Sequence, residues 1–306
     1  MTRRRPTALG GSGFPQRPGQ DFGKTTVGIV GFGAFGRLIA RHLAAHFDLM
    51  AYDPAPGFRE SAVSLGVTPV DLETAARCDV VVLAAPVSSL ERVVRDIAPF
   101  CRPGALVIDV ASVKVWPVAV MRDTLPVHVR IIATHPLFGP ESAGDGIAGL
   151  KIAVCPVRGP CQCLLSFLRE RLQLEVIETT PEAHDREAAT VQGLTHFIAK
   201  LLSEMGPMPT RLTTASFDLL VQAIAMVQED SPEVFQAIET MNPYAQGVRR
   251  EFLERAVQLD RSLCTGTNLA EDRPGPAEDG DACLQGRAVP DRSRQPLQNQ
   301  RKDSVT

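Results

Sequence analysis

The chain has 306 residues, with 32 basic and 35 acidic side chains and a formal net charge of −3. This length predicts two domains, and a hydrophobic share of 44% provides enough apolar side chains for a packed core. The charge balance argues against a nucleic-acid-binding protein, and no apolar run has the roughly 20 residues that cross a bilayer. Seven cysteines form no even disulfide framework and no CxxC pair, so we expect a cytoplasmic protein with reduced thiols and no metal.

Both ends of the chain have the composition of unfolded segments. Residues 1–23 are rich in Gly, Pro and Arg, and residues 261–306 combine sparse apolar residues with mixed charges and prolines. We predict a disordered arm (1–23) and a disordered tail (261–306). Between them we predict a sheet domain over 24–180 and a helical domain over 181–260.

Short β-branched runs alternate with amphipathic stretches in the first of these domains. Such runs suit parallel strands that are covered on both faces. The predicted strands are Val27–Val30, Leu49–Tyr52, Asp79–Ala84, Ala105–Val110 and Arg130–Thr134, and the predicted helices are Leu38–Phe47, Leu90–Phe100 and Val115–Leu125. This alternation predicts an α/β fold with a doubly wound, Rossmann-type parallel sheet.

Helical patterns replace strand patterns after Thr180. A long helix is predicted from Pro181 to Met205, and further helices over Leu212–Gln228, Pro232–Met241 and Pro243–Leu259. A helical domain of this size is too small to stand alone, so we expect a homodimer that forms through it. The apolar residues that favour this interface are Phe197, Leu201, Leu219, Leu220, Ile224, Phe235 and Ile238.

A glycine-rich turn, Gly31-Phe32-Gly33-Ala34-Phe35-Gly36, follows the first predicted strand. Gly31 permits a tight turn, Gly33 lets the backbone approach a pyrophosphate, and Gly36 allows close helix–strand packing. Asp53 ends the second strand, 22 residues after Gly31. A carboxylate there accepts hydrogen bonds from ribose hydroxyls and repels a 2′-phosphate, so the motif predicts NAD rather than NADP. The alternative is a glycine turn and an Asp-Pro turn without a ligand.

Polar side chains follow two of the predicted strands. Ser112 and Lys114 come after the strand over 105–110, and His135 ends the strand over 130–134. In open α/β sheets, ligands bind just outside the carboxyl ends of the strands, where these residues stand. A histidine there suits general-base chemistry because its unperturbed pKa of about 6.5 lies near neutrality. A structural histidine that caps a turn is the alternative.

The long predicted helix carries a second polar group. Gln192 and His196 lie four residues apart on one face, where they either bind a common ligand or pair within the helical core. Asp185, in the first turn, suits the positive end of its helix. The residues alone assign no role to His184.

Five segments together resemble the prephenate/arogenate dehydrogenase family of tyrosine biosynthesis. They are IVGFGAFG, DVASVK, THPLFGPES, HD followed by Q-x-x-x-H, and MNPYA, within Lys24–Leu259. The resemblance implies a Rossmann-type domain, a helical dimerisation domain and an NAD-dependent oxidative decarboxylation. The implied reaction converts arogenate to tyrosine, or prephenate to 4-hydroxyphenylpyruvate, with release of CO2.

The resemblance also implies roles for single residues. His135 matches the family histidine that takes the proton of the substrate 4-hydroxyl, and Ser112 matches the serine that orients this hydroxyl and the histidine. An arginine of the last helix, Arg250 or Arg249, is expected to bind a substrate carboxylate. The positions that we assign to substrate binding are Gln192, His196, Lys114, Asp230 and Arg250.

Asp230 bears on which substrate is used. Plant-like arogenate dehydrogenases have an aspartate twelve residues before the Asn of an Asn-Pro pair, and Asp230 stands twelve residues before Asn242. A carboxylate there attracts the ammonium of arogenate and disfavours the side chain of prephenate. The alternatives are a helix-start role for Asp230, and an enzyme that prefers prephenate or accepts both substrates.

Two other functions fit parts of the sequence. A β-hydroxyacid or imine reductase of the same architecture would use a lysine of the long helix, and Lys200 lies one turn beyond His196. The segment THPLFGPES has no counterpart in that chemistry. A non-catalytic NAD-sensing protein is the second alternative, and the joint presence of Ser112, His135, Gln192 and His196 argues against it.

Overall fold

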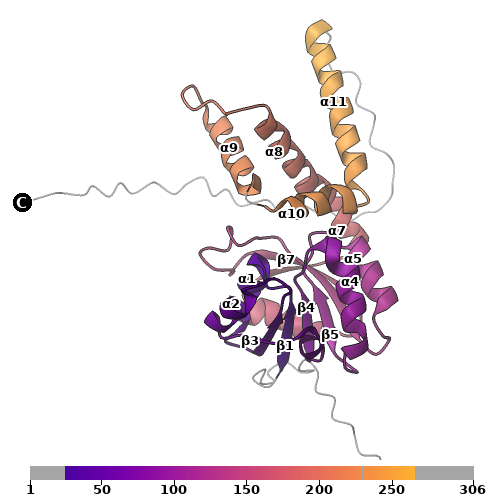
Figure 1. The fold of residues 1–306 in the computed structure, drawn as a ribbon. Coiled ribbons are helices and arrows are strands. Elements are labelled where there is room, and N and C mark those ends of the chain that lie inside the picture. Colours follow the sequence, from indigo (N-terminus) through magenta and orange to yellow (C-terminus); the bar gives the residue numbers. More distant parts are fainter. Residues whose placement is uncertain (1–24, 229, 266–306) are drawn as a thin grey trace, which may run out of the picture. The chain divides into compact units, whose positions relative to one another are not determined.

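A computed structural model describes residues 25–228 and 230–265, and Figure 1 shows their arrangement. The chain divides into two compact units, Met1–Ala256 and Val257–Thr306. The described part of the second unit is the end of helix α11 (Ala245–Thr265), which continues past the helical boundary predicted at Asp260. The predicted arm and the rest of the predicted tail lie outside the described residues.

An eight-stranded sheet forms the centre of the first unit in the described residues, in the order β3-β2-β1-β4-β5-β6-β7-β8. All neighbours from β3 to β6 are parallel, which confirms the doubly wound Rossmann-type sheet. β7 is antiparallel to β6, and β8 is parallel to β7. The strands are β1 (Thr26–Val30), β2 (Asp48–Tyr52), β3 (Thr68–Pro69), β4 (Val80–Leu83), β5 (Leu106–Asp109), β6 (Arg130–Pro136), β7 (Lys151–Arg158) and β8 (Glu175–Glu178).

Helices cover both faces of the sheet because the buried strands alternate their side chains. In β4, Val80 and Val82 join one apolar cluster, and Val81 and Leu83 join the other. The first cluster takes residues from α1, α2, α6 and the π-helical turn η2, and the second from α3, α4 and α5. The helices are α1 (Ala34–Leu43), α2 (Phe58–Ser64), α3 (Leu72–Ala76), α4 (Val87–Ile97), α5 (Val115–Thr124), α6 (Gln162–Ser166) and η2 (Phe167–Arg171).

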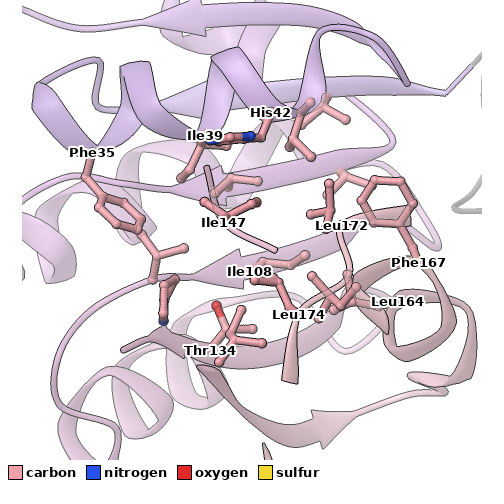
Figure 2. Close-up of a pocket in the computed structure, with 18 of the residues that line it drawn as sticks. Phe35, Ile39, His42, Ile108, Thr134, Ile147, Leu164, Phe167, Leu172 and Leu174 are labelled. Atoms are coloured by element: carbon pink, nitrogen blue, oxygen red, sulfur yellow. The ribbon is translucent and has the colours of Figure 1, made fainter. Parts of the chain in front are cut away.

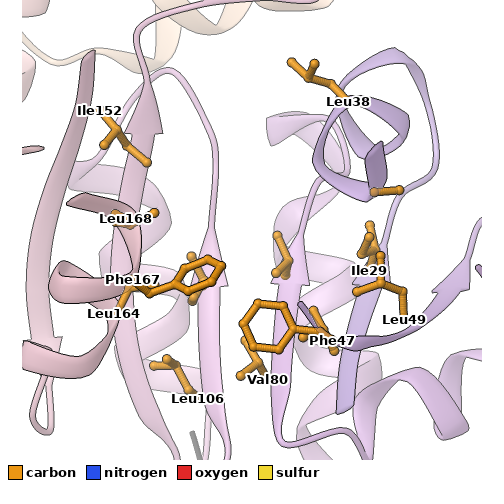
Figure 3. Packing of buried hydrophobic residues seen from close by; sticks show 14 of the residues in the cluster. Ile29, Leu38, Phe47, Leu49, Val80, Leu106, Ile152, Leu164, Phe167 and Leu168 are labelled. Carbon is orange, nitrogen blue, oxygen red and sulfur yellow. The ribbon is translucent and has the colours of Figure 1, made fainter. Parts of the chain in front are cut away.

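Two aromatic rings pack against each other in the first cluster, beside η2. Phe47 and Phe167 point toward each other with ring centroids 5.0 Å apart, although they lie far apart in the sequence (Figure 3). Aromatic contacts at such a distance add to the stabilisation that comes from burial alone.

An apolar cavity of about 110 Å³ lies in the same cluster, beside α1 (Figure 2). Phe35 and Ile39 of α1 line it together with Ile108 of β5. Thr134 and Pro136 of β6 also line it, whereas His135, between them, points to the opposite face by strand alternation. The cavity is therefore a packing void of the core, on the other side of β6 from the polar residues of the strand ends.

The predicted long helix from Pro181 is interrupted. Its parts are α7 (Pro181–Ala188), the π-helical turn η3 (Ala189–Gly193) and α8 (Leu194–Glu204). Helix α9 (Ala215–Gln228) packs beside α8 (Figure 1), and α10 (Pro232–Gln236) leads into a second π-helical turn, η4 (Ala237–Met241). Short π-helical segments inside α-helices are frequent at functional sites.

Apolar side chains remain exposed on these helices. Of those expected at an interface, Leu201, Leu219 and Leu220 are exposed, whereas Ile224 and Ile238 are buried. No helix in the described part of the chain combines the length and apolarity needed to cross a membrane.

We predict that Gly28→Ala lowers the free energy of unfolding by about 1–3 kcal/mol, because an added Cβ in β1 would overpack the core. That Cβ would lie 2.1 Å from the carbonyl oxygen of Ala75 in α3. Gly139→Ala is the matched control, since a Cβ there meets no atom within 4 Å. Urea unfolding measures both variants, and equal midpoints for the two would contradict the close packing of α3 on β1.

Candidate active site

The glycine-rich turn joins β1 to α1 with the geometry that its sequence predicts. Gly31 has a φ of 100°, and a Cβ there would lie 2.5 Å from the carbonyl carbon of Ala84. A Cβ on Gly36 would lie 2.2 Å from the carbonyl oxygen of Gly31. Gly33, by contrast, begins α1 with open space around it and gives the helix no side-chain cap. The first and third glycines thus serve packing, while the second leaves the N-terminus of α1 open to an anion.

Asp53 lies beside this turn, after the end of β2. Its Oδ2 accepts a hydrogen bond from the backbone N–H of Phe32 at 2.6 Å, and its Oδ1 accepts one from Ala55 at 2.8 Å. These two bonds hold the carboxylate next to the open turn. The predicted cofactor residues Gly31, Phe32, Gly33, Ala34, Phe35, Gly36 and Asp53 therefore belong to one local structure.

A buried ion pair joins the carboxyl ends of β5 and β6. The ammonium of Lys114 donates to Oδ2 of Asp109 and, at 2.6 Å, to the carbonyl oxygen of Thr134. Both charged side chains are completely buried. Burial raises the pKa of Asp109, and the charge of Lys114 opposes this shift. Since a buried charge is costly without its partner, the pair fixes the residue that precedes His135.

The ammonium of Lys114 is enclosed and bonded within the protein, where it supports the strand ends. Its assignment to substrate binding stays a prediction. Ser112 is half-buried in the loop that follows β5, and no hydrogen bond joins it to another residue in the described part of the chain. Its predicted role as an orienting residue stays a prediction.

The carboxylate of Asp185 connects α7 to the N-terminus of α5. It accepts hydrogen bonds from the backbone N–H groups of Lys114 at 2.7 Å and Val115 at 2.9 Å. A third donor is Nδ1 of His184 at 2.8 Å. Asn242 also donates to the backbone oxygen of Asp185 at 2.7 Å. The sequence suggested that Asp185 favours its own helix, but its side chain caps another helix about 70 residues away.

His135 extends this network toward the strand end. Its Nδ1 lies 2.9 Å from Nε2 of His184, and the two rings meet edge-on with centroids 5.1 Å apart. His135 is buried at 4% exposure. Burial lowers the pKa of His135 well below its usual range, and the nearby His184 and Lys114 lower it further. His135 is therefore a neutral imidazole near neutral pH.

Gln192, His196 and Asp230 form a second polar group. Nδ1 of His196 donates to the backbone oxygen of Gln192 at 2.9 Å, and its Nε2 lies 2.9 Å from Oδ2 of Asp230. Burial lowers the pKa of His196, but the hydrogen bonds to Asp230 and to the Gln192 carbonyl outweigh burial and raise it. The buried side-chain oxygen of Gln192 has no hydrogen-bond partner among the described residues.

The two candidate arginines of α11 differ in how exposed their side chains are. Arg250, the residue assigned to substrate binding, is 76% exposed and lies near Glu254 of its own helix. Arg249 is mostly buried; its Nη1 donates to the side chain of Glu239 and, at 2.8 Å, to its backbone oxygen. The structure therefore turns Arg249, and not Arg250, toward the buried residues.

Three contributors to the site escaped sequence reasoning. Asp109 reads as an ordinary strand residue, Asn242 as part of a motif without a role, and His184 as a helix residue. The signal available in the sequence was the separation of only five residues between Asp109 and Lys114. A buried strand that ends in a carboxylate needs a cation nearby. In the described residues, no group of three or more His, Cys, Asp or Glu side chains is placed to hold a metal ion.

Two family models match the chain in succession. The model described as prephenate dehydrogenase, nucleotide-binding domain, matches residues 36–150. The model described as prephenate dehydrogenase, dimerization domain, matches residues 180–271. Together they cover more than half of the chain.

Curated relatives agree with these models. Arogenate dehydrogenase 2, chloroplastic, of Arabidopsis thaliana is 31% identical over 251 residues, which cover 78% of this chain and 67% of that relative. Arogenate dehydrogenase 1, chloroplastic, of the same plant is 30% identical over 260 residues. That match covers 80% of this chain but only 39% of the second relative, so the chain spans well under two thirds of its length.

A solved structure shares the fold. The prephenate dehydrogenase of A. aeolicus, crystallised with hydroxyphenyl propionate and NAD+, superimposes with a TM-score of 0.65 at 20% sequence identity. The match covers 81% of this chain and 93% of that structure. On the family models and the curated relatives, the chain belongs to the prephenate/arogenate dehydrogenase family.

Proposed function

We propose that this protein catalyses the NAD-dependent oxidative decarboxylation of a cyclohexadienol, arogenate or prephenate, with release of CO2. The observation that carries the proposal is the buried position of His135 at the carboxyl end of β6, where burial lowers its pKa. Parallel strands of this sheet end at the edge where ligands of such folds bind. Membership of the family and the names of the relatives support the same reaction.

His135 performs the proton transfer of the proposed reaction. A neutral imidazole nitrogen takes the proton of the ring hydroxyl while the ring carbon that carries this hydroxyl loses hydride. The O–H bond breaks, an N–H bond forms, and the oxygen becomes a carbonyl. Loss of the ring carboxylate as CO2 then returns its bonding electrons to the ring, which becomes aromatic as the oxygen regains a proton. Burial beside a cation suits this base because it keeps the imidazole unprotonated before each turnover.

The residues of the glycine-rich turn fit a nicotinamide dinucleotide. NAD+ supplies the hydride acceptor. The open space at Gly33 and the uncapped start of α1 suit a pyrophosphate, and Asp53 suits the ribose hydroxyls. The family model for a nucleotide-binding domain supports this assignment, and the negative charge of Asp53 favours NAD over NADP.

Arogenate is the proposed substrate of choice. Its amino acid group carries an ammonium, and Asp230, whose Oδ2 lies 2.9 Å from Nε2 of His196, supplies a carboxylate of opposite charge. Asp230 retains 40% side-chain exposure, which leaves its carboxylate accessible to an ammonium. The two named plant relatives, both arogenate dehydrogenases, support this choice. Arg249 is the proposed partner of a substrate carboxylate in place of Arg250.

The proposal also includes a homodimer that forms through the helices that follow β8. The family model for the second half is described as a dimerization domain, and Leu219 and Met226 of α9 are 66% and 68% exposed. Apolar exposure of this extent usually marks an interface. A cytoplasmic location stays a prediction.

Replacing His135 by Asn is expected to lower kcat by about 10²–10⁴-fold, the usual contribution of a general base. The Kd for NAD+ should stay unchanged, which shows that the fold is intact. In the parent enzyme, kcat/KM should fall only as the pH drops below about 6.5, because the lowered pKa of His135 keeps the base unprotonated above that value. Near-normal turnover of the variant would exclude His135 as the base.

The parent enzyme should use NAD+ with a kcat/KM at least about 100-fold above that for NADP+, because like charges brought together cost several kcal/mol. Asp53→Ser should reduce this ratio by improving the use of NADP+. Steady-state kinetics with both cofactors measure the effect, and an equal preference in the parent enzyme would refute the role of Asp53.

Substituting Asp230 by Asn is expected to reduce the kcat/KM ratio of arogenate to prephenate by about 10–100-fold, the value of a hydrogen bond to a charged group. Asp218→Asn is the matched control, because Asp218 is an exposed carboxylate of neighbouring α9. A parent enzyme that favours prephenate, or a ratio that Asp230→Asn leaves unchanged, would show that Asp230 does not select the substrate.

Light scattering at micromolar concentration should give twice the mass of the chain. The double variant Leu219→Glu/Met226→Glu should shift this value toward the monomer, because it places charges on the exposed face of α9. Val127→Glu, at an apolar residue that is 89% exposed near α5, should leave the mass unchanged. A monomeric parent protein would rule out the dimer.

A further inference from the structure

His184 lies between two groups that determine where its own hydrogen atom sits. Its Nδ1 is 2.8 Å from Oδ1 of Asp185, and its Nε2 is 2.9 Å from Nδ1 of His135. The side chain is buried in α7, at 5% exposure. Both ring nitrogens are therefore engaged within the protein.

The carboxylate of Asp185 acts as an acceptor in all its side-chain contacts. Backbone N–H groups of Lys114 and Val115 donate to its two oxygens, and these donors cannot reverse their roles. The N-terminus of α5, which these groups open, also stabilises a negative charge. Nδ1 of His184 must consequently carry the hydrogen that it shares with Asp185.

The hydrogen of His135 follows from this assignment. In the neutral form of His184, with the hydrogen on Nδ1, the lone pair on Nε2 accepts a hydrogen bond. Nδ1 of His135 must then be the donor at 2.9 Å. The remaining nitrogen of His135, Nε2, is left with a lone pair, and no hydrogen bond joins it to another residue in the described part of the chain.

We propose that His184 and Asp185 are positioning residues that hold His135 in the tautomer with the hydrogen on Nδ1 and the lone pair on Nε2. This inference rests on the proposed function, because that lone pair is what receives the proton of the substrate hydroxyl. The opposite tautomer would present an N–H group to the hydroxyl and would leave two lone pairs facing each other between His135 and His184. In this arrangement His135 donates a hydrogen bond to His184, and His184 donates one to Asp185.

The arrangement also supports the charge that forms on His135 during the reaction. Once Nε2 has taken a proton, Nδ1–H continues to donate to His184 without any rearrangement. His184 in turn donates a hydrogen bond from Nδ1 to the Asp185 carboxylate. The negative charge of this carboxylate makes Nε2 of His184 a stronger hydrogen-bond acceptor. Asp185 is fixed by the first turn of α5, so the orientation of His135 depends on the join between α5 and α7.

The tautomer is measurable without substrate. In ring ¹H–¹⁵N correlation spectra at mildly alkaline pH, where a neutral imidazole is expected, Nδ1 of His135 should have the shift of a protonated nitrogen and Nε2 that of an unprotonated one. The signals of His135 are identified by their absence in His135→Asn. An inverted pattern, with the hydrogen on Nε2, would overturn the proposal.

Two variants of similar size test the consequence for catalysis. His184→Leu removes the acceptor for His135, and kcat should fall by about 100-fold or more, within the range of a misplaced general base. His184→Gln keeps an acceptor oxygen in reach and should retain most of kcat. KM for the substrate and Kd for NAD+ should change by no more than about twofold in either variant if the loss lies in the proton-transfer step. Asp185 is left unchanged, because its carboxylate also holds the start of α5.

A further variant controls for the loss of any histidine. His128→Leu removes an exposed histidine that contacts the backbone of Cys101 and precedes β6, at the opposite end of that strand from His135, and kcat should not change. Equal kcat values for His184→Leu and His184→Gln would overturn the positioning role. A parent enzyme that is inactive on both cyclohexadienols would instead refute the proposed function, while the spectra still decide the tautomer.

Discussion

The carboxylate of Asp185 is the point on which the arrangement of the site depends. It is completely buried, and three hydrogen-bond donors converge on it from α5 and α7. Asn242 binds its backbone oxygen, so the segment after η4 meets the same residue. Removing this anion would leave two backbone N–H groups and the Nδ1–H of His184 without a partner at once, which is costly in a buried place. One residue therefore joins the start of α5, α7 and the segment after η4.

The buried pair of Asp109 and Lys114 performs a related task at the strand ends. Its ammonium bridges the end of β5 to the carbonyl oxygen of Thr134 in β6, one residue before His135. The backbone of Lys114 is meanwhile held by Asp185. His135 is thus fixed twice, through its backbone by the ion pair and through its ring by His184. Rigid support of this kind is what a group needs to meet a reacting atom in a repeatable geometry.

Features set by local sequence were predictable, and features set by distant contacts were not. Apolar strands, the glycine turn and Asp53 follow from residues close together in the chain, and the sheet and turn agree with them. The antiparallel β7 carries no local signal that distinguishes its direction. The capping of α5 by Asp185 joins residues about 70 positions apart, which no periodicity reveals. Lys114 and Arg250 were assigned by motif and register, but enclosure of one and outward rotation of the other decide where each side chain points.

Two histidines with the same intrinsic chemistry have pKa values that their surroundings shift in opposite directions. His135 faces another histidine and a nearby lysine in a buried setting, and its pKa is lowered. His196 is also buried, but a carbonyl and a carboxylate face its two nitrogens, and its pKa is raised. The proposed reaction uses the lowered pKa of His135, because only an unprotonated ring removes a proton. The environment of each ring, rather than the residue type, therefore separates the base from the binding group.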